Sequence, residues 1–228
     1  GQDAGLIAGS GNSGVMVTAD VDAVLNDAEV LIDFTFPEVT RSIAPKAAAQ
    51  GVSLVIGSTG LTADDKAMLS GLASKGARIV CSPNMSVGVN LLFALCGKVA
   101  KILGDAYDIE VVEMHHNMKK DAPSGTAERL GEILAEARGL KYGDAVRHGR
   151  EGNVGARTKH EIGMHALRGG DVVGDHTVIF ATGGERVELT HKASSRDTFA
   201  LGAMRAVKFL GSAKPGLYDM QDVLGLKD

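Results

Sequence analysis

Residues 110–134 contain the side chains with the clearest potential for chemistry in this chain. His115 and His116 stand side by side, Lys119 follows, and Ser124 opens a predicted helix. A histidine gains or loses a proton near neutral pH, and a lysine pairs with a carboxylate or donates a proton. Free N–H groups in the first turn of a helix bind anions. The segment therefore predicts an anion pocket beside a proton source.

The first turn of that predicted helix holds three small residues, Ser124, Gly125 and Thr126. Gly125 lets a ligand approach the backbone closely, and Thr126 adds a hydroxyl donor. The alternative is a plain N-cap with a flexible residue beside it. Together with Lys119 the pattern favours anion binding, whereas Lys120 is interpreted as a solvated surface charge.

The histidine pair has three interpretations. As zinc ligands, both would reach one metal only if the backbone turned, because adjacent strand residues point to opposite faces, and the chain has no H-E-x-x-H motif. In the second interpretation one histidine is a core residue with satisfied hydrogen bonds. In the third, one carries a proton and the other contacts substrate. Lys119 and the helix start favour the third, so no metal is expected.

The remaining histidines are scattered over the second half of the chain. His148 is interpreted as a surface residue. One or two of the others could line the substrate pocket, from the set His160, His165, His176 and His191. His160, next to Lys159, is the best placed of them.

Strands and helices alternate before this segment and must form the frame beside it. Strands and connecting helices are expected in turn at residues 28–35, 38–51, 52–60, 62–76 and 77–84. Thr62 is the expected N-cap of the second helix, with Asp65 three residues later in a capping-box arrangement. This order predicts a parallel sheet.

Each of these strands ends in small or polar residues. Ligands bind beyond the carboxyl ends of strands in open α/β sheets, so the three ends predict one binding edge. The alternative is that they are ordinary loop residues. The strand ends are Thr35, residues 57–60 and residues 82–84.

The second half predicts an α+β domain. A helix at 89–103, a strand at 108–116 and a helix at 124–139 are followed by alternating segments over residues 161–194. Gly169-Gly170-Asp171 and Gly183-Gly184-Glu185 are expected to be hairpin turns. A closing helix at 196–212 would return to the first domain.

Composition excludes several classes of protein. The chain has 228 residues and a net charge of −4, which gives no reason to expect nucleic acid as a partner. Its two cysteines are interpreted as buried thiols in a reducing compartment. No uninterrupted apolar run reaches the roughly 18–20 residues that span a bilayer, so no membrane partner is expected.

The sequence "EMHHNMKKDAPSGTA" resembles the signature E-x-H-H-x-x-K-x-D-A-P-S-G-T-A of the 4-hydroxy-tetrahydrodipicolinate reductases, also called dihydrodipicolinate reductases. "VLIDFTFPE", "VIGSTG", "NMSVGVN", "REG", "GDVVGDHTV" and "GERVELTHKASSR" resemble further segments of that family in the same order. The resemblance covers essentially the whole chain. It implies reduction of 4-hydroxy-tetrahydrodipicolinate, after loss of water, to tetrahydrodipicolinate with NADPH or NADH, in diaminopimelate and lysine synthesis.

The resemblance also implies roles for individual residues. His115 would accept or donate a proton and Lys119 would donate one, while the dicarboxylate substrate would contact the set His116, Ser124, Gly125 and Thr126. The nicotinamide side of the cofactor would lie against the set Phe34, Thr35, Gly57, Ser58, Thr59, Ser82, Pro83, Asn84 and Met85. A related substrate remains an alternative.

One departure from the family pattern concerns the start of the chain. The expected strand, G-x-x-G-x-x-G turn, helix and second strand are not found, and "GLIAGSGNSG" resembles a later loop. The alternative function is therefore a fragment that keeps the substrate domain but is inactive for lack of cofactor binding. A second departure is Phe36, where many members have arginine.

The expected architecture is a Rossmann-like parallel sheet, incomplete at the N-terminus, plus an α+β domain with a mixed sheet. Residues 1–86 and 197–228 would form the dinucleotide-binding domain, and residues 87–196 would form the substrate-binding and tetramerisation domain. The resemblance implies a cytoplasmic homotetramer whose β-rich domains form the central contact.

Overall fold

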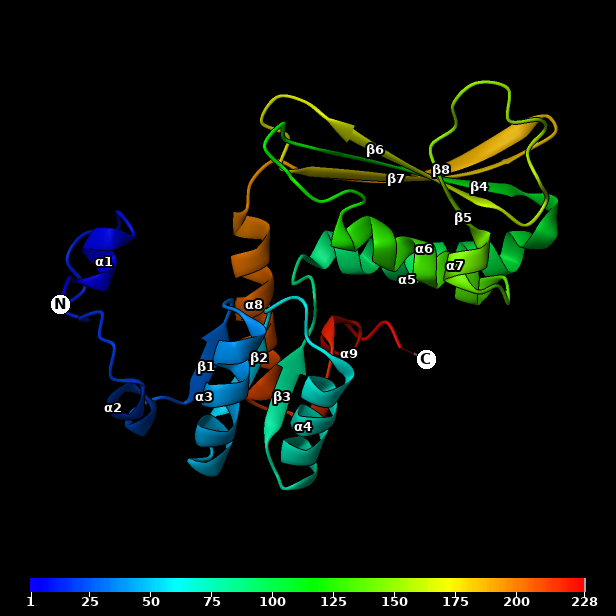
Figure 1. The fold of residues 1–228 in the computed structure, drawn as a ribbon. Helices are drawn as coiled ribbons and strands as arrows, with labels where there is room; N and C mark the ends of the chain where they lie inside the picture. The colour runs from blue at the N-terminus through cyan, green and yellow to red at the C-terminus, as the bar shows by residue number, and fades with distance from the viewer. Residues whose placement is uncertain (228) are drawn as a thin grey trace. The chain divides into compact units, whose positions relative to one another are not determined.

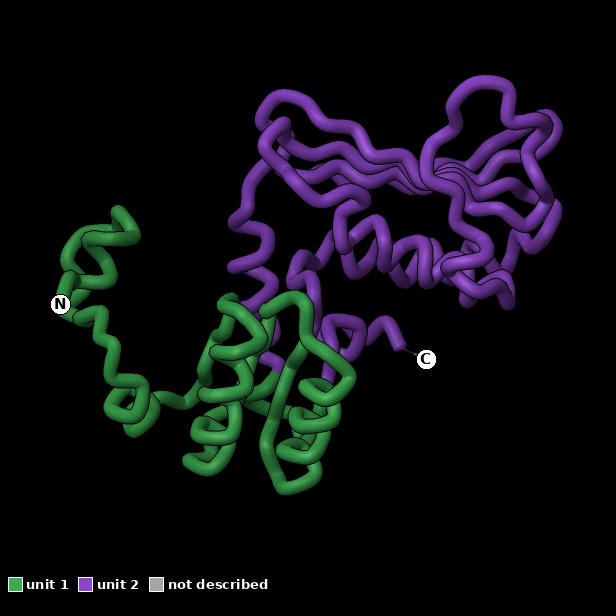
Figure 2. The backbone as a smooth tube through the Cα atoms, viewed as in Figure 1, with its two compact units in different colours: residues 1–81, 210–217 green, residues 82–209, 218–228 purple. Residues whose placement is uncertain are grey.

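A computed structural model describes residues 1–227. The chain folds into two compact units, which Figure 2 shows in different colours. The first comprises residues 1–81 and 210–217, and the second comprises residues 82–209 and 218–228. These are groupings by contact, so the functional boundaries expected above remain a prediction.

The first unit contains a parallel sheet, as the alternating pattern predicts. Strands β1 (Val30–Asp33), β2 (Ser53–Ile56) and β3 (Arg78–Cys81) pair in parallel, with Asp33 opposite Ile56 and Ile56 opposite Cys81. The full order is β1-β2-β3-β9, with β9 at Gly216–Tyr218. Every residue of β2 is buried, as expected for a central strand. The carboxyl ends of β1, β2 and β3 therefore lie along one edge of the sheet.

The helices that connect these strands begin at residues typical of helix starts. Helix α3 (Pro37–Ala49) has Pro37 in its first turn and continues through Pro45. Helix α4 (Ala63–Ser74) has the predicted capping box, in which Thr62 Oγ1 accepts from the Asp65 N–H and the Asp65 carboxylate accepts from the Thr62 N–H.

The N-terminal segment contains two short helices, α1 (Ala4–Ile7) and α2 (Val21–Asn26), seen at the blue end of the ribbon in Figure 1. The glycine-rich loop after α1 closes on the Asp3 carboxylate, which accepts from the N–H groups of Ser13, Leu6 and Gly14. The hydrogen bond from the Ser13 N–H is the largest cause of the lowered pKa of Asp3, about 2. The hydrogen bonds to Asp3 therefore stabilise the conformation of this loop.

The second unit contains a mixed sheet in the order β5-β6-β4-β7-β8. Its strands are β5 (Val146–His148), β6 (Ile162–Arg168), β4 (Asp108–His115), β7 (Gly174–Thr182) and β8 (Glu185–Ala193). Strand β4 is parallel to β6 and antiparallel to β7. These two sheets confirm the predicted fold class.

One predicted hairpin is confirmed and the other is wrong. Strands β7 and β8 pair antiparallel across Gly183-Gly184, with Thr182 opposite Glu185. Gly184 has φ +92°, which suits a glycine in a tight hairpin turn. Strands β6 and β7 do not pair, because β4 lies between them. The Gly169-Gly170 turn therefore connects two strands that lie on either side of β4. The residues of the turn do not indicate that β4 lies between these strands.

Helices α5 (Val87–Leu103), α6 (Gly125–Ala137) and α7 (Tyr142–Ala145) lie along one face of the mixed sheet (Figure 1). Their apolar faces meet inward-facing side chains of β4, β6 and β7. The buried core includes Leu92, Phe93, Cys96, Val111, Leu130, Leu134, Ile162, Met164, Val178 and Phe180. The predicted helices at 89–103 and 124–139 are confirmed within a few residues.

Helix α5 is also notable for its length and apolar character. Residues 87–106 of the described chain are long and apolar enough to cross a membrane by composition alone, and one third of the most apolar window is buried. Its side chains Leu92, Phe93 and Cys96 belong to the core described above. One face of the helix therefore packs in the core of the second unit.

The remaining elements complete the chain. They are the 3-10 helix η1 (Gly104–Ala106), α8 (Asp197–Leu210) and α9 (Met220–Leu224). Helix α8 corresponds to the closing helix predicted at residues 196–212.

Candidate active site

The N-terminus of α6 has the exposed backbone that the sequence predicts. Ser124 is the N-cap, and its Oγ accepts from the Ala127 N–H at 3.2 Å. Gly125 is exposed, and a Cβ placed there would meet nothing within 4 Å. Thr126 is half-buried beside it. The first turn is therefore open to a ligand, and its N–H groups carry the partial positive charge of the helix start.

His115 lies at the end of β4 and bonds to a buried carboxylate on the same strand. Its Nδ1 is 2.6 Å from Oε2 of Glu113, two residues earlier. Side chains two apart on a strand share a face, so the pair meets without any turn of the backbone. A Cβ at Gly174 on β7 would come within 3.0 Å of His115 Nε2. The absence of a side chain at Gly174 therefore leaves room beside that nitrogen.

Glu113 is fully buried and has several partners. Arg168 donates to both of its oxygens, at 2.8 and 2.9 Å, and the Ser124 N–H donates at 3.0 Å. Burial alone would raise the pKa of Glu113, but the hydrogen bonds from Arg168, His115 and Ser124 outweigh it and lower the pKa. The carboxylate is therefore charged at neutral pH.

The loop after β4 holds the other predicted proton carrier. Lys119 Nζ lies 2.9 Å from the carboxylate of Asp121, and the Lys119 side chain is 20% exposed. Arg168 donates to the backbone oxygen of Asp121 at 2.7 Å. His116 is half-buried, directly after His115. All of the sequence-predicted substrate residues thus lie on the segment from the end of β4 to the first turn of α6.

His176 on β7 is a further member of this site. Its Nε2 lies 3.1 Å from Ser124 Oγ, and its ring packs edge-on against His115 with centroids 5.2 Å apart. Burial, followed by repulsion from His115, lowers the pKa of His176 to about 3. His176 is therefore neutral and supports the start of α6.

The loop after β3 carries the second part of the predicted cofactor set. Asn84 donates through Nδ2 to Thr126 Oγ1 at 3.1 Å, and its backbone oxygen accepts from Ser82 Oγ at 2.9 Å. Pro83 is exposed, whereas Met85 is buried. This loop therefore bonds directly to the first turn of α6 within the second unit.

The first part of the cofactor set surrounds a buried carboxylate at the end of β1. Asp33 accepts from the hydroxyls of Thr35 at 2.5 Å, Thr40 at 2.5 Å and Ser58 at 3.1 Å. Burial would raise the pKa of Asp33, but these hydrogen bonds and the Thr35 N–H lower it. The hydroxyls of Thr35 and Ser58 are thus turned towards Asp33, so the strand ends of β1 and β2 are tied together.

The exposed groups at these strand ends fit a dinucleotide cofactor. Phe34 and Thr59 are exposed just beyond β1 and β2, where open parallel sheets bind nucleotides. A Cβ at Gly57 would overlap the Phe34 ring, so a larger residue there would displace that ring. Because two of the hydroxyls serve Asp33, contacts to a cofactor would come from backbone groups and the Phe34 ring. Phe36, the N-cap residue of α3, is also exposed, and its side chain makes no capping hydrogen bond.

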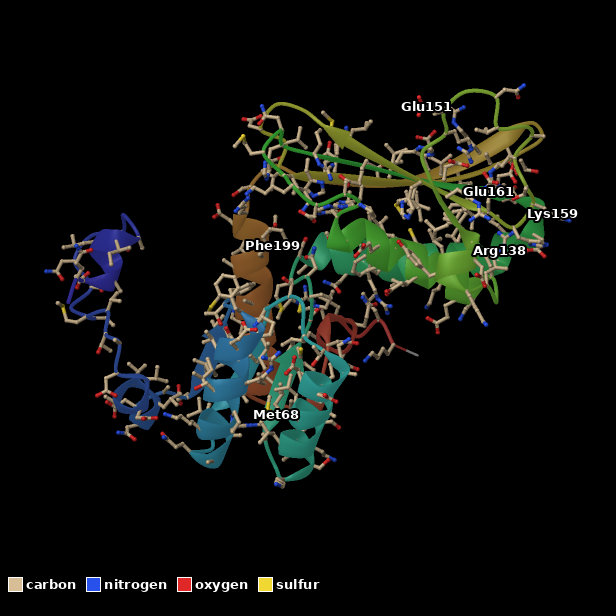
Figure 3. All side chains as sticks on the ribbon, viewed as in Figure 1. Met68, Arg138, Glu151, Lys159, Glu161 and Phe199 are labelled. Atoms are coloured by element: carbon tan, nitrogen blue, oxygen red, sulfur yellow. The ribbon has the colours of Figure 1, made fainter. Side chains whose placement is uncertain are left out.

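The suggestion that His160 lines the substrate pocket is wrong for this chain. His160 lies beside Arg138, Lys159 and Glu161 around a small cavity, and Figure 3 shows these three labelled side chains at one end of the second unit. That end is where β4 begins, whereas His115 closes β4, about 20 Å away at a strand rise of about 3.3 Å per residue. The neighbouring Lys159 does not indicate where His160 lies in the fold. His160 comes just before β6 and therefore lies at the end of the sheet where β6 begins.

Another cavity, of about 390 Å³, lies beside the loop that precedes α6. Pro123 and Leu167 line it together with His148, which is exposed as the sequence suggests, and with Arg150. His165 also lines it and bonds to Glu110 at 2.7 Å on the sheet face opposite the core. These histidines therefore lie apart from Glu113 and His115.

Sequence reasoning missed three residues that hold the site together, Asp33, Glu113 and Arg168, and it left His176 among several histidines that could line the pocket. Glu113 had a local signal, since a carboxylate two residues before a histidine on a strand shares its face. Asp33 also has near neighbours as partners, Thr35 and Thr40. The contact of Arg168 with Glu113, by contrast, joins residues far apart in sequence.

The donor set suits an anion. Among residues 1–227, no group of three or more His, Cys, Asp or Glu side chains is arranged to hold a metal ion. His115 instead faces Glu113, and the nearby Lys119 and helix start attract negative charge.

Comparison with known proteins gives a consistent family. Residues 1–85 match the family described as "Dihydrodipicolinate reductase, N-terminus", and residues 88–224 match "Dihydrodipicolinate reductase, C-terminus". The chain is 54% identical to the 4-hydroxy-tetrahydrodipicolinate reductase of Syntrophotalea carbinolica and 53% identical to that of Hahella chejuensis. Each alignment covers 100% of this chain and 85% of the relative.

Solved structures share the fold. A dipicolinate-bound dihydrodipicolinate reductase from Paenisporosarcina sp. TG-14 superposes with a TM-score of 0.72 at 24% identity, covering 97% of this chain and 86% of that one. An amine dehydrogenase from Mycobacterium smegmatis superposes with a TM-score of 0.55 at 14% identity, covering 95% and 83%.

Proposed function

Because this chain belongs to the dihydrodipicolinate reductase family, we propose that it reduces 4-hydroxy-tetrahydrodipicolinate, after loss of water, to tetrahydrodipicolinate. This is an oxidoreductase reaction of the diaminopimelate route to lysine. One observation carries the assignment beyond family membership. The Ser124 N–H at the start of α6 and the Nδ1 of His115 both bond to Glu113, so an anion-binding helix start and a proton carrier lie side by side.

We propose that the substrate is bound through its carboxylates. The exposed backbone of Gly125 and the hydroxyl of Thr126 would bind one carboxylate at the start of α6, with the Ser124 N-cap holding that turn open. His116 and Lys119 would supply further polar contacts from the preceding loop. A dianion suits this site, because the helix start and the lysine both favour negative charge.

Reduction of a conjugated imine consumes one hydride and one proton. The nicotinamide cofactor, NADPH or NADH, supplies the hydride when bound. We propose that Lys119 donates this proton from Nζ and that His115 accepts or donates, at Nε2, the proton exchanged in the preceding loss of water. Glu113 holds the His115 ring in place, since its ionised carboxylate lies 2.6 Å from Nδ1.

The proposed cofactor contacts lie at the carboxyl ends of the parallel strands. Phe34, Thr35 and residues 57–59 would contribute from β1 and β2, and residues 82–85 would contribute from the loop after β3. The support is the fold itself, since open parallel sheets bind nucleotides beyond these ends. We also propose a cofactor domain (1–86 and 197–228), which contains the parallel sheet, and a substrate domain (87–196), which contains the mixed sheet.

The proposed assembly is a cytoplasmic homotetramer. The support is the face of the mixed sheet opposite α5 and α6, which carries Val112, Met114 and Ile179 beside polar residues of β8. Native mass spectrometry would test this, with four chains of 23.6 kDa expected in the complex. A monomer at micromolar concentration would contradict it.

The activity is tested by following oxidation of NADPH and of NADH by this chain with 4-hydroxy-tetrahydrodipicolinate. Turnover that pyridine-2,6-dicarboxylate inhibits competitively is expected. Binding of the dicarboxylate without binding of either cofactor, measured by fluorescence titration, would instead identify the chain as a substrate-binding module without reductase activity.

A further inference from the structure

We propose that Glu113 is a positioning residue that keeps the proton of His115 on Nδ1, presents Nε2 to the substrate and ties this histidine to the first turn of α6. The inference deepens the proposed function and rests on it for the role of His115. It concerns a residue that need not touch substrate or cofactor.

The first step is the number of donors that Glu113 satisfies. Four hydrogen bonds converge on its two oxygens, from Arg168 at 2.8 and 2.9 Å, from the Ser124 N–H at 3.0 Å and from His115 Nδ1 at 2.6 Å. Each oxygen accepts one bond from Arg168 and one from another residue. The side chain is fully buried. An ionised carboxylate is the one form of this residue that accepts all four bonds.

The second step is the consequence for His115. A carboxylate without a proton cannot donate, so the hydrogen between Glu113 and His115 must belong to Nδ1. Nε2 is then the nitrogen that exchanges a proton with a bound molecule. Gly174 supports this arrangement, because a Cβ there would come within 3.0 Å of Nε2 and narrow the space beside it.

The third step links Glu113 to the second proton carrier. The same guanidinium of Arg168 that bonds Glu113 also donates to the backbone oxygen of Asp121 at 2.7 Å. The Asp121 side chain in turn holds Lys119 at 2.9 Å. One buried carboxylate therefore connects His115, the start of α6 and, through Arg168, the loop that carries Lys119.

Replacing Glu113 by glutamine shows which partner must yield. Whichever carboxylate oxygen the amide NH2 replaces, it would face two hydrogen-bond donors. One of them is always Arg168, and the other is His115 or the Ser124 N–H. Arg168 cannot lose its proton, and neither can the Ser124 N–H. His115 alone can adapt, by moving its proton from Nδ1 to Nε2 and accepting from the amide. Glu113→Gln is therefore expected to switch the tautomer of His115.

The same strand offers a closely matched control. Glu110, three residues earlier and on the opposite face of β4, accepts from Arg150 at 2.7 and 3.0 Å and lies 2.7 Å from His165 Nε2. Glu110→Gln therefore removes a carboxylate with an arginine and a histidine partner, at a place remote from His115. It controls for the general cost of losing such an ion pair.

The experiment combines NMR with kinetics. Protein labelled with ¹⁵N-histidine is measured at alkaline pH, with His115→Gln used to assign the His115 signals. Wild type, Glu110→Gln and Glu113→Asp, which keeps the charge, are expected to show Nδ1–H at His115. Glu113→Gln is expected to show Nε2–H or a mixture. Its kcat should fall by about 10-fold to 10⁴-fold, between the loss seen for an outer carboxylate partner and that for a triad carboxylate, while Glu110→Gln retains most of its turnover.

The outcomes separate the possibilities. Nε2–H in wild type, or unchanged Nδ1–H with normal kcat in Glu113→Gln, would overturn the inference. If Glu113→Gln does not fold, Glu113→Asp decides, since Nε2–H in that variant would also overturn it and Nδ1–H would support it. A wild-type chain without reductase activity but with the expected tautomers would refute the proposed function and leave the positioning of His115 standing.

Discussion

Asn84 and Thr126 are joined by a hydrogen bond of 3.1 Å from Nδ2 to Oγ1, across 42 residues of sequence. It connects the loop after β3, proposed to face the cofactor, with the helix turn proposed to bind substrate. Because Asn84 occupies a lone pair of the Thr126 oxygen, the hydroxyl hydrogen is left to donate elsewhere. The Thr126 hydroxyl is therefore prepared to bind a carboxylate oxygen.

Thr126→Val is expected to weaken binding of pyridine-2,6-dicarboxylate by about 1.5–3 kcal/mol, the range for a hydrogen bond to a charged group. Titration calorimetry would measure the change in Kd. Thr177→Val is a suitable control, because Thr177 bonds to Thr190 on the other face of the sheet. Equal affinity of both variants and wild type would remove Thr126 from the binding site.

His115→Gln and Lys119→Ala are each expected to lower kcat by about 100-fold or more, the usual contribution of a positioned acid or base. The His115 side chain is 12% exposed and that of Lys119 is 20% exposed, so both changes open onto the site and circular dichroism should change little. Lys120→Ala is the control for Lys119, since Lys120 is exposed. Near-normal turnover of both site variants would refute the catalytic assignment.

Asp33→Asn is expected to weaken NADPH and NADH binding and to destabilise the first unit. The hydroxyls that now donate to a charged carboxylate would face a neutral amide, and a hydrogen bond to a charged group contributes about 1.5–3 kcal/mol against about 0.5–1.5 kcal/mol for a neutral pair. Fluorescence titration and urea unfolding would measure both effects. Asp64→Asn, at an exposed position of α4, should leave both unchanged.

Acid should destabilise the second unit through Glu110. Burial would raise the pKa of Glu110, but hydrogen bonds from Arg150, His165 and Arg157 lower it from 4.5 to about 2. Between these values the unfolded chain binds more protons than the folded chain, so stability falls as pH drops from about 4.5 to about 2. Glu110→Gln should make this dependence shallower in urea unfolding at several pH values. An unchanged slope would contradict the assignment.

His176 should produce a separate loss of stability at milder pH. Burial, then repulsion from His115, lowers its pKa from 6.5 to about 3. The unfolded chain therefore takes up a proton that the folded chain refuses, and stability falls as pH drops from about 6.5 to about 3. In His176→Gln this part of the slope should disappear, as monitored by thermal unfolding between pH 7 and pH 5. A slope equal to that of wild type would show that His176 does not titrate in this way.

The sequence predicted elements well wherever local rules decide them. The capping residues Thr62 and Ser124 begin α4 and α6 as expected, because an N-cap acts within its own turn. The parallel order of β1, β2 and β3 also followed from the alternation of strands and helices. The hairpin expected at Gly169-Gly170 was wrong because pairing with β4 depends on residues far away in sequence.

The residues proposed to carry protons, the helix start and the family can be identified from the sequence alone, since residue type, spacing and motif are local properties. The tertiary structure decided what holds them. Only folding brings Arg168 from β6 and His176 from β7 against Glu113 and Ser124, and only burial makes those contacts strong enough to fix a charge and a tautomer. His160 shows the reverse, because its sequence context suggested a pocket and the register of β6 placed it at the far end of the sheet.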